Sequence, residues 1–371
     1  MNKFCNILLI FIFSVFSCNS GLQKNEMDTL VDCSGKTHLK FIVNNCKDTT
    51  VFHIQSRTVI PWKLENKQIV IPKDGIYNLT INSTHPMLDL FFCQNKRYPL
   101  FTIPHDTLNV YVDLDLSGNR QNSIHYAGKT EHINIYYHEK FERFNYPDIA
   151  VPATNYTSPS YSIYEGAVKI DSLFNEEKKF LLNYENAADL PNWFIELEKL
   201  NLYYHSAEFK LGAISSRNQL NGENTKANDP YFNFLDSVPI HNPKAYLSSR
   251  YFEFLRAYYY NTNMDKYEAN TTGFERAFAI LKINLPDILN GLSGETRKQF
   301  IAYHFSWYYF MTKNTSEVLK LDSLFGTISN YVNDSKLVDV VKTNRNSQNE
   351  DVKKVSYLNK GEKAPDFYLR M

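Results

Sequence analysis

The spacing of apolar residues changes near residue 128, and this change constrains the fold more than any other feature of the chain. From residue 36 to 128 apolar and polar residues alternate, as in the run 108–114, which is typical of strands that bury one face. From residue 129 to 350 apolar residues recur at three- and four-residue steps, which is typical of amphipathic helices. The sequence therefore predicts an α+β protein in which a β domain precedes a helical domain.

The segment 36–128 predicts an antiparallel β-sandwich, because short strands with one apolar face, such as 39–43, need a second sheet to cover that face. Trp62 and Tyr98 leave two interpretations open. They could form an exposed aromatic surface that stacks on a glycan, or they could belong to the sandwich core. Phe and Tyr occur 26 times each, which fits codon drift in an AT-rich genome, so the sequence favours the core.

Residues 129–350 predict an irregular helical bundle, since no tetratricopeptide-like period of about 34 residues is found. The aromatic stripes within 246–254 and 300–311 are expected to lie in its core. Helical spacing assigns these residues to one apolar face: Ile163, Ala167, Ile170, Phe174, Lys178 and Leu181. Start signals are the caps Asp229, Asn242, Thr272 and Ser293, and stop signals are Gly212, the Leu285–Pro286 break and Gly291.

Motifs for nucleotide binding and for serine hydrolysis are absent from the sequence. His132 and His138 are six positions apart, so on a helix they point to different faces, and this spacing does not suit a zinc pair. Paired acidic residues are expected to form solvated helix faces: Glu176, Glu177, Glu196 and Glu198. The sequence thus predicts no catalytic residue, no metal site and no cofactor in this chain.

The balance of charge excludes one class of partner. The chain carries 40 Lys and Arg against 40 Asp and Glu, and no basic stripe is visible. A nucleic-acid-binding protein normally needs clustered positive charge to displace counterions from the phosphates. The sequence therefore predicts that nucleic acid is not a partner.

The N-terminus predicts export. Residues 1–17 combine Lys3 with a short apolar run, which is typical of a signal peptide and too short to span a bilayer. The run Val15–Cys18 resembles a bacterial lipobox, so Cys18 is expected to be lipidated and residues 18–35 to form a spacer. Cleavage near Ser17 without lipidation is the alternative. We expect a chain anchored by lipid to a membrane in the cell envelope of a Gram-negative bacterium.

Three cysteines remain after Cys18, at positions 33, 46 and 93, and no C-x-x-C occurs in the chain. A disulfide between Cys46 and Cys93 is one interpretation, because an oxidising envelope permits it. The other, which the sequence favours, is a set of small, inert, half-buried thiols.

The segment 356–371 carries the most specific motif. The motif consists of Gly361, Ala364, Pro365, Asp366 and Phe367 in the pattern G-x-x-A-P-D-F. It resembles the start of the thioredoxin-like domain of TlpA/ResA-type thiol–disulfide oxidoreductases and, in similar form, of peroxiredoxins. The segments 103–108 and 126–128 also resemble part of the β-rich N-terminal domain of envelope TlpA-like proteins.

The resemblance implies a redox protein whose reaction uses a C-x-x-C at a helix N-terminus. Because this chain lacks that pair, we expect it to be the non-catalytic N-terminal part of such an oxidoreductase, either as a fragment or as the product of an interrupted gene. Its expected partners are the membrane, through the lipid, and disulfides of envelope proteins. The alternatives are a surface lipoprotein that binds glycan or peptide through its sandwich, and a peroxiredoxin fragment.

Overall fold

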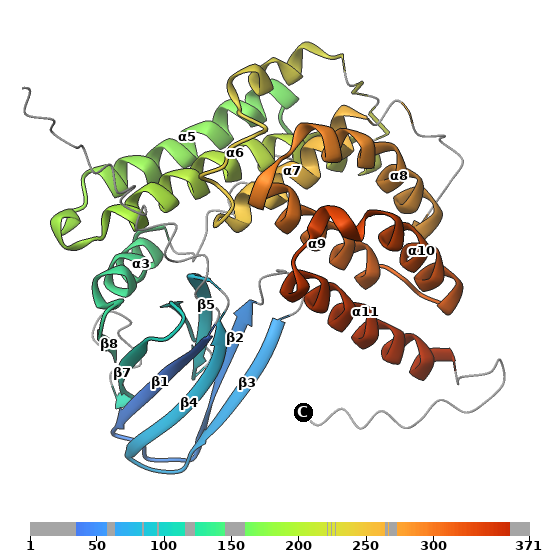
Figure 1. Cartoon of the computed structure of the whole chain (residues 1–371). Coiled ribbons are helices and arrows are strands. Elements are labelled where there is room, and N and C mark those ends of the chain that lie inside the picture. Colours follow the sequence, from blue (N-terminus) through green and yellow to red (C-terminus); the bar gives the residue numbers. More distant parts are fainter. Residues whose placement is uncertain are drawn as a thin grey trace, which may run out of the picture.

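The computed structural model describes a β domain followed by a helical domain (Figure 1). The described residues are 35–57, 64–83, 85–94, 96–115, 123–144, 160–220, 222–223, 225–226, 228–263, 266 and 273–356. The expected α+β class is confirmed, while residues 357–371, which include the motif that resembles a thioredoxin-like domain, lie outside these ranges.

The described strands form two four-stranded sheets, one in the order β4-β1-β7-β8 and the other in the order β3-β2-β5-β6. The strand bounds are β1 Gly35–Asn44, β2 Thr50–Arg57, β3 Leu64–Ile71, β4 Gly75–Ser83, β5 Met87–Cys93, β6 Lys96–Thr102, β7 Thr107–Asp113 and β8 Ile124–Ala127.

The two sheets enclose one apolar core, so the predicted sandwich is confirmed. Alternate residues of β1 point inward, and Phe41 at its centre is fully buried. Its ring meets Phe52 of the opposite sheet at 5.6 Å and Phe91 at 5.1 Å between centroids. Burial of each such ring contributes about 1.5–3 kcal/mol, which accounts for the preference of this segment for two stacked sheets.

One pairing differs from the prediction of an antiparallel sandwich. Strands β1 and β7 run parallel, with Phe41 opposite Val110, whereas the other described pairs are antiparallel. Parallel neighbours need a long crossover connection, which strands β2 to β6 provide here. An alternating apolar pattern shows which face is buried but carries no information on strand direction.

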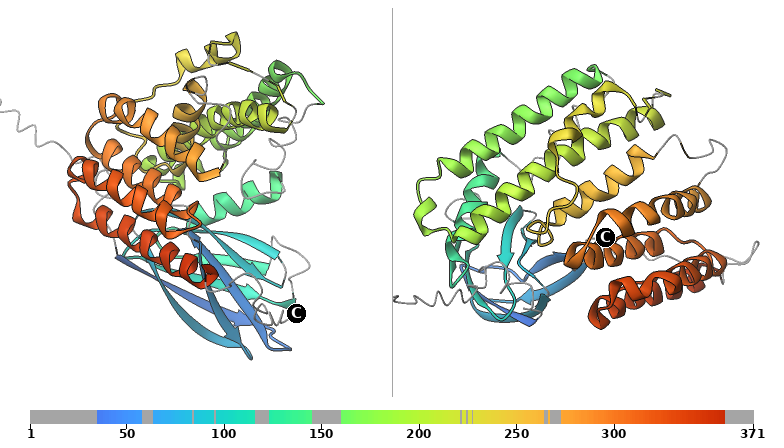
Figure 2. Two further views of the ribbon diagram at one scale, coloured as in Figure 1. Left: turned by 90° about the vertical axis from the view of Figure 1, so that its right-hand side faces the viewer. Right: turned by 45° about the horizontal axis from the view of Figure 1, so that its top comes forward.

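The helical domain begins with α3 directly after β8. Its elements are α3 Glu131–Phe144, α5 Ile163–Leu182, η2 Ala187–Asp189, α6 Asn192–Leu220, η3 Pro230–Ser237, α7 Ser249–Thr262, α8 Gly273–Gly291, α9 Gly294–Phe310, α10 Thr315–Val332 and α11 Ser335–Ser356. Helices α5 and α6 lie side by side, and α9, α10 and α11 form a second layer on the other side of α7 and α8 (Figure 2).

Some of the predicted helix signals are confirmed. Asp229 caps η3, with its side chain accepting from the Tyr231 amide and with Pro230 in the first turn. Ser293 stands at the N-cap of α9, and α8 ends at Gly291 as expected. Thr272 lies outside the described residues.

Three other signals are wrong. Helix α6 continues through Gly212, α8 continues through Pro286, and after Asn242 no helix begins until α7, which Ser248 caps. Pro286 is exposed and the two buried residues beside it, Leu285 and Ile288, pack into the helical core. That burial outweighs the cost of about 3 kcal/mol that proline imposes in a helix.

Helix α3 joins the two domains. It contacts β6 and β8, each of which is one of the two edge strands of its sheet, so α3 closes one side of the sandwich. Its buried face, with Ile133, Tyr136 and Tyr137, belongs to an aromatic cluster that also takes in Phe101 of β6 and Phe194 of α6. The sandwich and the helices therefore share a continuous apolar contact.

Candidate functional site

Most residues that the sequence singles out for function lie outside the described residues. They are Cys18, Trp62, Gly361, Ala364, Pro365, Asp366 and Phe367. Lipidation and the thioredoxin-like motif therefore stay predictions from sequence.

Tyr98 lies in the sandwich core and not on a glycan-binding face. It is 2% exposed, its ring is 5.8 Å from that of Phe91, and its hydroxyl lies 3.1 Å from that of Ser123. The core interpretation is confirmed for Tyr98 and the stacking interpretation is wrong for it. In the described strands Tyr111 is the one exposed aromatic residue, at 39%, so these strands offer no aromatic cluster to a sugar.

Cys46 and Cys93 are free thiols, so the alternative of a disulfide between them is not realised in this structure. Burial raises the pKa of Cys93 to about 12. Burial, followed by the carboxylates of Asp74 and Asp48, also raises the pKa of Cys46. Since the thiolate is the nucleophile, both thiols are poor candidates for disulfide exchange, in keeping with the interpretation as inert thiols.

A cluster of charged side chains lies buried where α3, α5 and α6 meet. The Lys140 ammonium of α3 is 2.5 Å from a Glu177 carboxylate oxygen of α5 and 2.8 Å from one of Glu198 in α6. The Tyr137 hydroxyl donates to the other Glu198 oxygen at 2.8 Å, and Asn201 donates to it at 3.3 Å. The prediction of solvated acidic faces is therefore wrong for Glu177 and Glu198. It is confirmed for Glu176 and Glu196, whose side chains are exposed.

Electrostatics explains how the cluster tolerates burial. Burial opposes ionisation of Glu198, but the Lys140 ammonium and the hydrogen bonds from Lys140, Tyr137 and Asn201 bring its pKa below the ordinary value. Burial likewise opposes the charge of Lys140, but Glu177 and Glu198 raise the pKa of its ammonium well above the ordinary value. The cluster thus holds three charges in place and fixes the helices that carry them.

The two histidines of α3 confirm the expectation that they face different ways. His132 is exposed, whereas His138 is buried, with ring centroids of Tyr98 and Tyr126 each 6.3 Å away. No group of three or more potential metal ligands occurs among the described residues.

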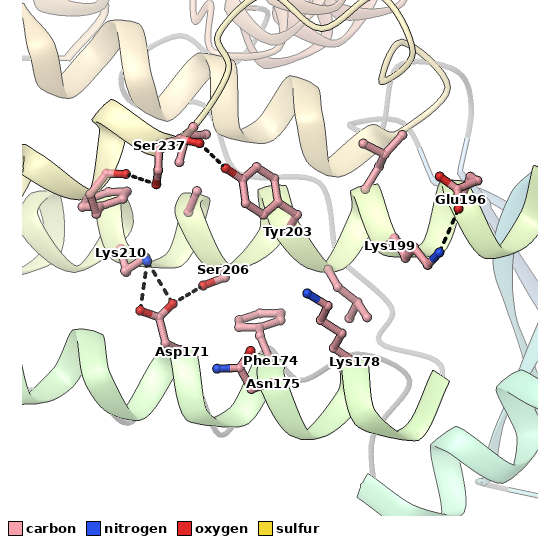
Figure 3. A pocket seen from close by; sticks show the side chains of 15 residues that line it. Asp171, Phe174, Asn175, Lys178, Glu196, Lys199, Tyr203, Ser206, Lys210 and Ser237 are labelled. Atoms are coloured by element: carbon pink, nitrogen blue, oxygen red, sulfur yellow. Dashed lines mark hydrogen bonds and ion pairs between the residues drawn. The ribbon is translucent and has the colours of Figure 1, made fainter. Parts of the chain in front are cut away.

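A groove of about 570 Å³ runs between α5, α6 and η3 (Figure 3). Asp171 of α5 accepts from the Ser206 hydroxyl at 2.8 Å and from the Lys210 ammonium at 2.9 and 3.1 Å. Tyr203 donates to the Ser237 carbonyl at 2.6 Å, so it ties η3 to α6. Apolar side chains complete the lining: Phe174, Leu200, Leu202, Ala207, Phe234 and Val238.

The polar groups of this groove are largely paired with one another. The charge of Asp171 is balanced by Lys210, whose ammonium also lies 4.6 Å from the centre of the Phe234 ring. The Ser206 hydroxyl donates to the same carboxylate, and no histidine is among the described residues that line the groove. The groove therefore combines apolar side chains with charged groups, most of which are paired.

Comparison with protein-family models, with curated proteins and with solved structures finds no match. Among the described residues no helix is long and apolar enough to cross a membrane.

Proposed function

We propose that this chain is the non-catalytic, partner-recognising region of a lipid-anchored thiol–disulfide oxidoreductase of the cell envelope. The observation that carries the proposal is the motif from Gly361 to Phe367, which resembles the start of the thioredoxin-like domain of TlpA/ResA-type proteins. The order of a β-sandwich followed by helices supports it, since envelope members of that family often have this layout.

The groove between α5, α6 and η3 supports the recognition role. Lys199 and Lys210 are paired with Glu196 and Asp171, but no ion pair of Lys178 is seen among the described residues. The apolar side chains of the groove, together with Lys178, which extends from α5, suit an extended segment that carries apolar and acidic side chains (Figure 3). Such a segment would come from the envelope protein whose disulfide is exchanged.

The proposal predicts that the chain alone does not reduce disulfides. In an insulin-reduction assay we expect the rate to equal that of the added dithiol reductant, because the raised pKa values of Cys46 and Cys93 leave few thiolates at neutral pH. The double variant Cys46→Ser/Cys93→Ser serves as the control and should behave in the same way. Turnover that disappears in this variant would place a redox site in the sandwich and contradict the non-catalytic role.

The DNA beyond the Met371 codon tests the family itself. An in-frame W-C-x-x-C within several tens of codons, about the distance expected from the motif to the catalytic helix of a thioredoxin-like domain, would support the proposal. A frame that continues into a domain without this cysteine pair would overturn it.

Membrane attachment is a separate prediction. We expect metabolic labelling of cells with a radioactive fatty acid to label the chain at Cys18 and the chain to sediment with membranes. Each buried methylene contributes about 0.8 kcal/mol, so two or more acyl chains give a stable anchor. The variant Cys18→Ala should lose the label and leave the membrane fraction, whereas Cys33→Ala should keep both. An unlabelled, soluble wild-type chain would favour simple cleavage near Ser17.

A further inference from the structure

A second pocket, of about 500 Å³, lies inside the helical domain between α6, α7, α8 and α9, away from the groove of Figure 3. Its walls are largely apolar, with Ala257, Ala277, Ile280, Trp307 and Met311 among the lining residues. Pockets of this size and composition commonly take up small organic molecules.

Two guanidinium groups give the pocket a positive character. Arg256 of α7 lies with its guanidinium carbon 5.2 Å from the centre of the Trp307 ring, and Arg276 of α8 also lines the pocket. The Arg276 Nε atom is buried and has no hydrogen-bond partner among the described residues. Among the described residues that line the pocket, only Glu208 carries a carboxylate, so within this set two positive charges face one negative charge.

His304 of α9 is a second, independent observation that points to a ligand site. Its side chain is 2% exposed and lines the pocket, yet neither ring nitrogen has a hydrogen-bond partner in the part of the chain that the structure describes. Burial and the nearby Arg256 lower the pKa of His304 to about 3, so the ring is neutral and offers one donor and one acceptor. Buried polar atoms are normally paired, so a ligand that reaches this ring would complete its hydrogen bonds.

Gly212 explains why the pocket stays open. It lies within α6, where glycine is unfavourable for a helix, and it lines the pocket. A Cβ atom at this position would meet no atom within 4 Å. The space that a larger residue would fill is therefore part of the cavity.

We propose that this pocket binds a small carboxylic acid with an apolar or aromatic body. The carboxylate pairs with the guanidinium groups of Arg256 and Arg276, His304 supplies a neutral hydrogen bond, and the body lies against Trp307 and the aliphatic walls. The excess of one positive charge among the described lining residues fits a monoanion better than a phosphate dianion. This inference does not depend on the proposed redox function.

Calorimetric titration of the full chain with 3-phenylpropionate, indole-3-acetate and octanoate tests the proposal. We expect at least one of these acids to bind, and the amide of the acid that binds to bind at least about tenfold more weakly, because it carries no charge for the guanidinium groups. Failure of all three acids to bind would overturn the proposal. Inorganic phosphate binding as tightly as the best acid would also overturn it, because the site would then recognise negative charge alone and not the apolar body of the acid.

Variants locate the site. Gly212→Leu places a side chain in the cavity at a helical position that favours leucine over glycine, so it should fold at least as well as wild type and bind the acid at least about tenfold more weakly. Arg276→Gln should weaken binding to a similar degree. Lys282→Gln, which removes an exposed charge from the same helix, should bind like wild type. Unchanged binding in the folded Gly212→Leu chain would place the acid elsewhere.

Discussion

Replacing Lys140 with methionine is expected to lower the free energy of unfolding by about 3–5 kcal/mol. Methionine keeps the length and the apolar stem of lysine but removes the ammonium that lies within 2.8 Å of both Glu177 and Glu198. Two carboxylates would then face each other in a site that is no more than 2% exposed at either residue. Urea denaturation followed by circular dichroism gives the measurement.

The same substitution should reverse the dependence of stability on acidity. In the wild type the pKa of Glu198 is lowered, so the folded state binds fewer protons than the unfolded state and stability falls as the pH drops through the ordinary carboxyl value of about 4.3. In Lys140→Met the uncompensated carboxylates have raised pKa values. The folded variant then binds more protons, and its stability should rise on acidification from about pH 7 to about pH 5.

Two further variants separate charge from packing. Lys140→Met/Glu177→Gln/Glu198→Gln removes all three charges and should recover most of the lost stability, because neutral side chains need no counter-ion. Lys199→Met breaks the partly exposed pair with Glu196 on α6 and should change stability by less than about 1 kcal/mol. If Lys140→Met changed the free energy of unfolding no more than Lys199→Met does, the buried cluster would contribute no more to stability than an exposed ion pair.

The buried face of the sandwich was predictable because it depends on local sequence. Alternation over residues 39–43 and 108–114 fixes which side chains point inward whatever the partner strand is. Turn residues such as Asp74–Gly75 fix where one strand ends and the next begins. The parallel pairing of β1 with β7 depends on the path of five intervening strands, and no local pattern records it.

The buried charge cluster was not predictable because its cause is remote in sequence. On a helix, the residues three and four positions after Phe174 both lie near its face, and these residues are Glu177 and Lys178. The helical spacing therefore cannot distinguish them, and it predicted that Lys178 lies on the apolar face. In the structure Lys178 is exposed and Glu177 is buried. Glu177 is the buried residue of the two because it forms an ion pair with Lys140 of α3. A signal did exist, because Lys140 itself continues the apolar stripe of Ile133 and Tyr136.

The predicted helix ends at Gly212 and Pro286 were wrong because the helix propensity of one residue contributes less free energy than the burial of its apolar neighbours. Glycine in a helix costs about 1 kcal/mol and proline about 3 kcal/mol, whereas one buried Leu or Ile contributes about 1.5–3 kcal/mol. Gly212 lies between Leu211 and Ile214, which are fully buried, so α6 continues. Both pockets are formed by side chains from several helices, and the residues of either pocket are not adjacent in the sequence.

Replacing Asn134 with leucine is expected to lower the free energy of unfolding by about 2–4 kcal/mol. Asn134 of α3 is fully buried and pairs with the backbone of Phe101 on β6. It accepts from the Phe101 amide at 2.7 Å and donates to the Phe101 carbonyl at 2.9 Å. Because β6 is an edge strand, this amide side chain takes the place of a further strand, and leucine would leave both backbone groups buried without partners.

A local measurement distinguishes this loss from general destabilisation. Hydrogen exchange should accelerate more at the Phe101 amide than at the amide of Phe41, which lies in the middle of the sandwich, because only the former loses its acceptor. Asn175→Leu, at an exposed position of α5, should change stability by less than about 0.5 kcal/mol. Equal acceleration at both amides would mean that Asn134 supports the fold as a whole. Selective acceleration at Phe101 would show that one side chain couples the edge of the sandwich to the helical domain with both pockets.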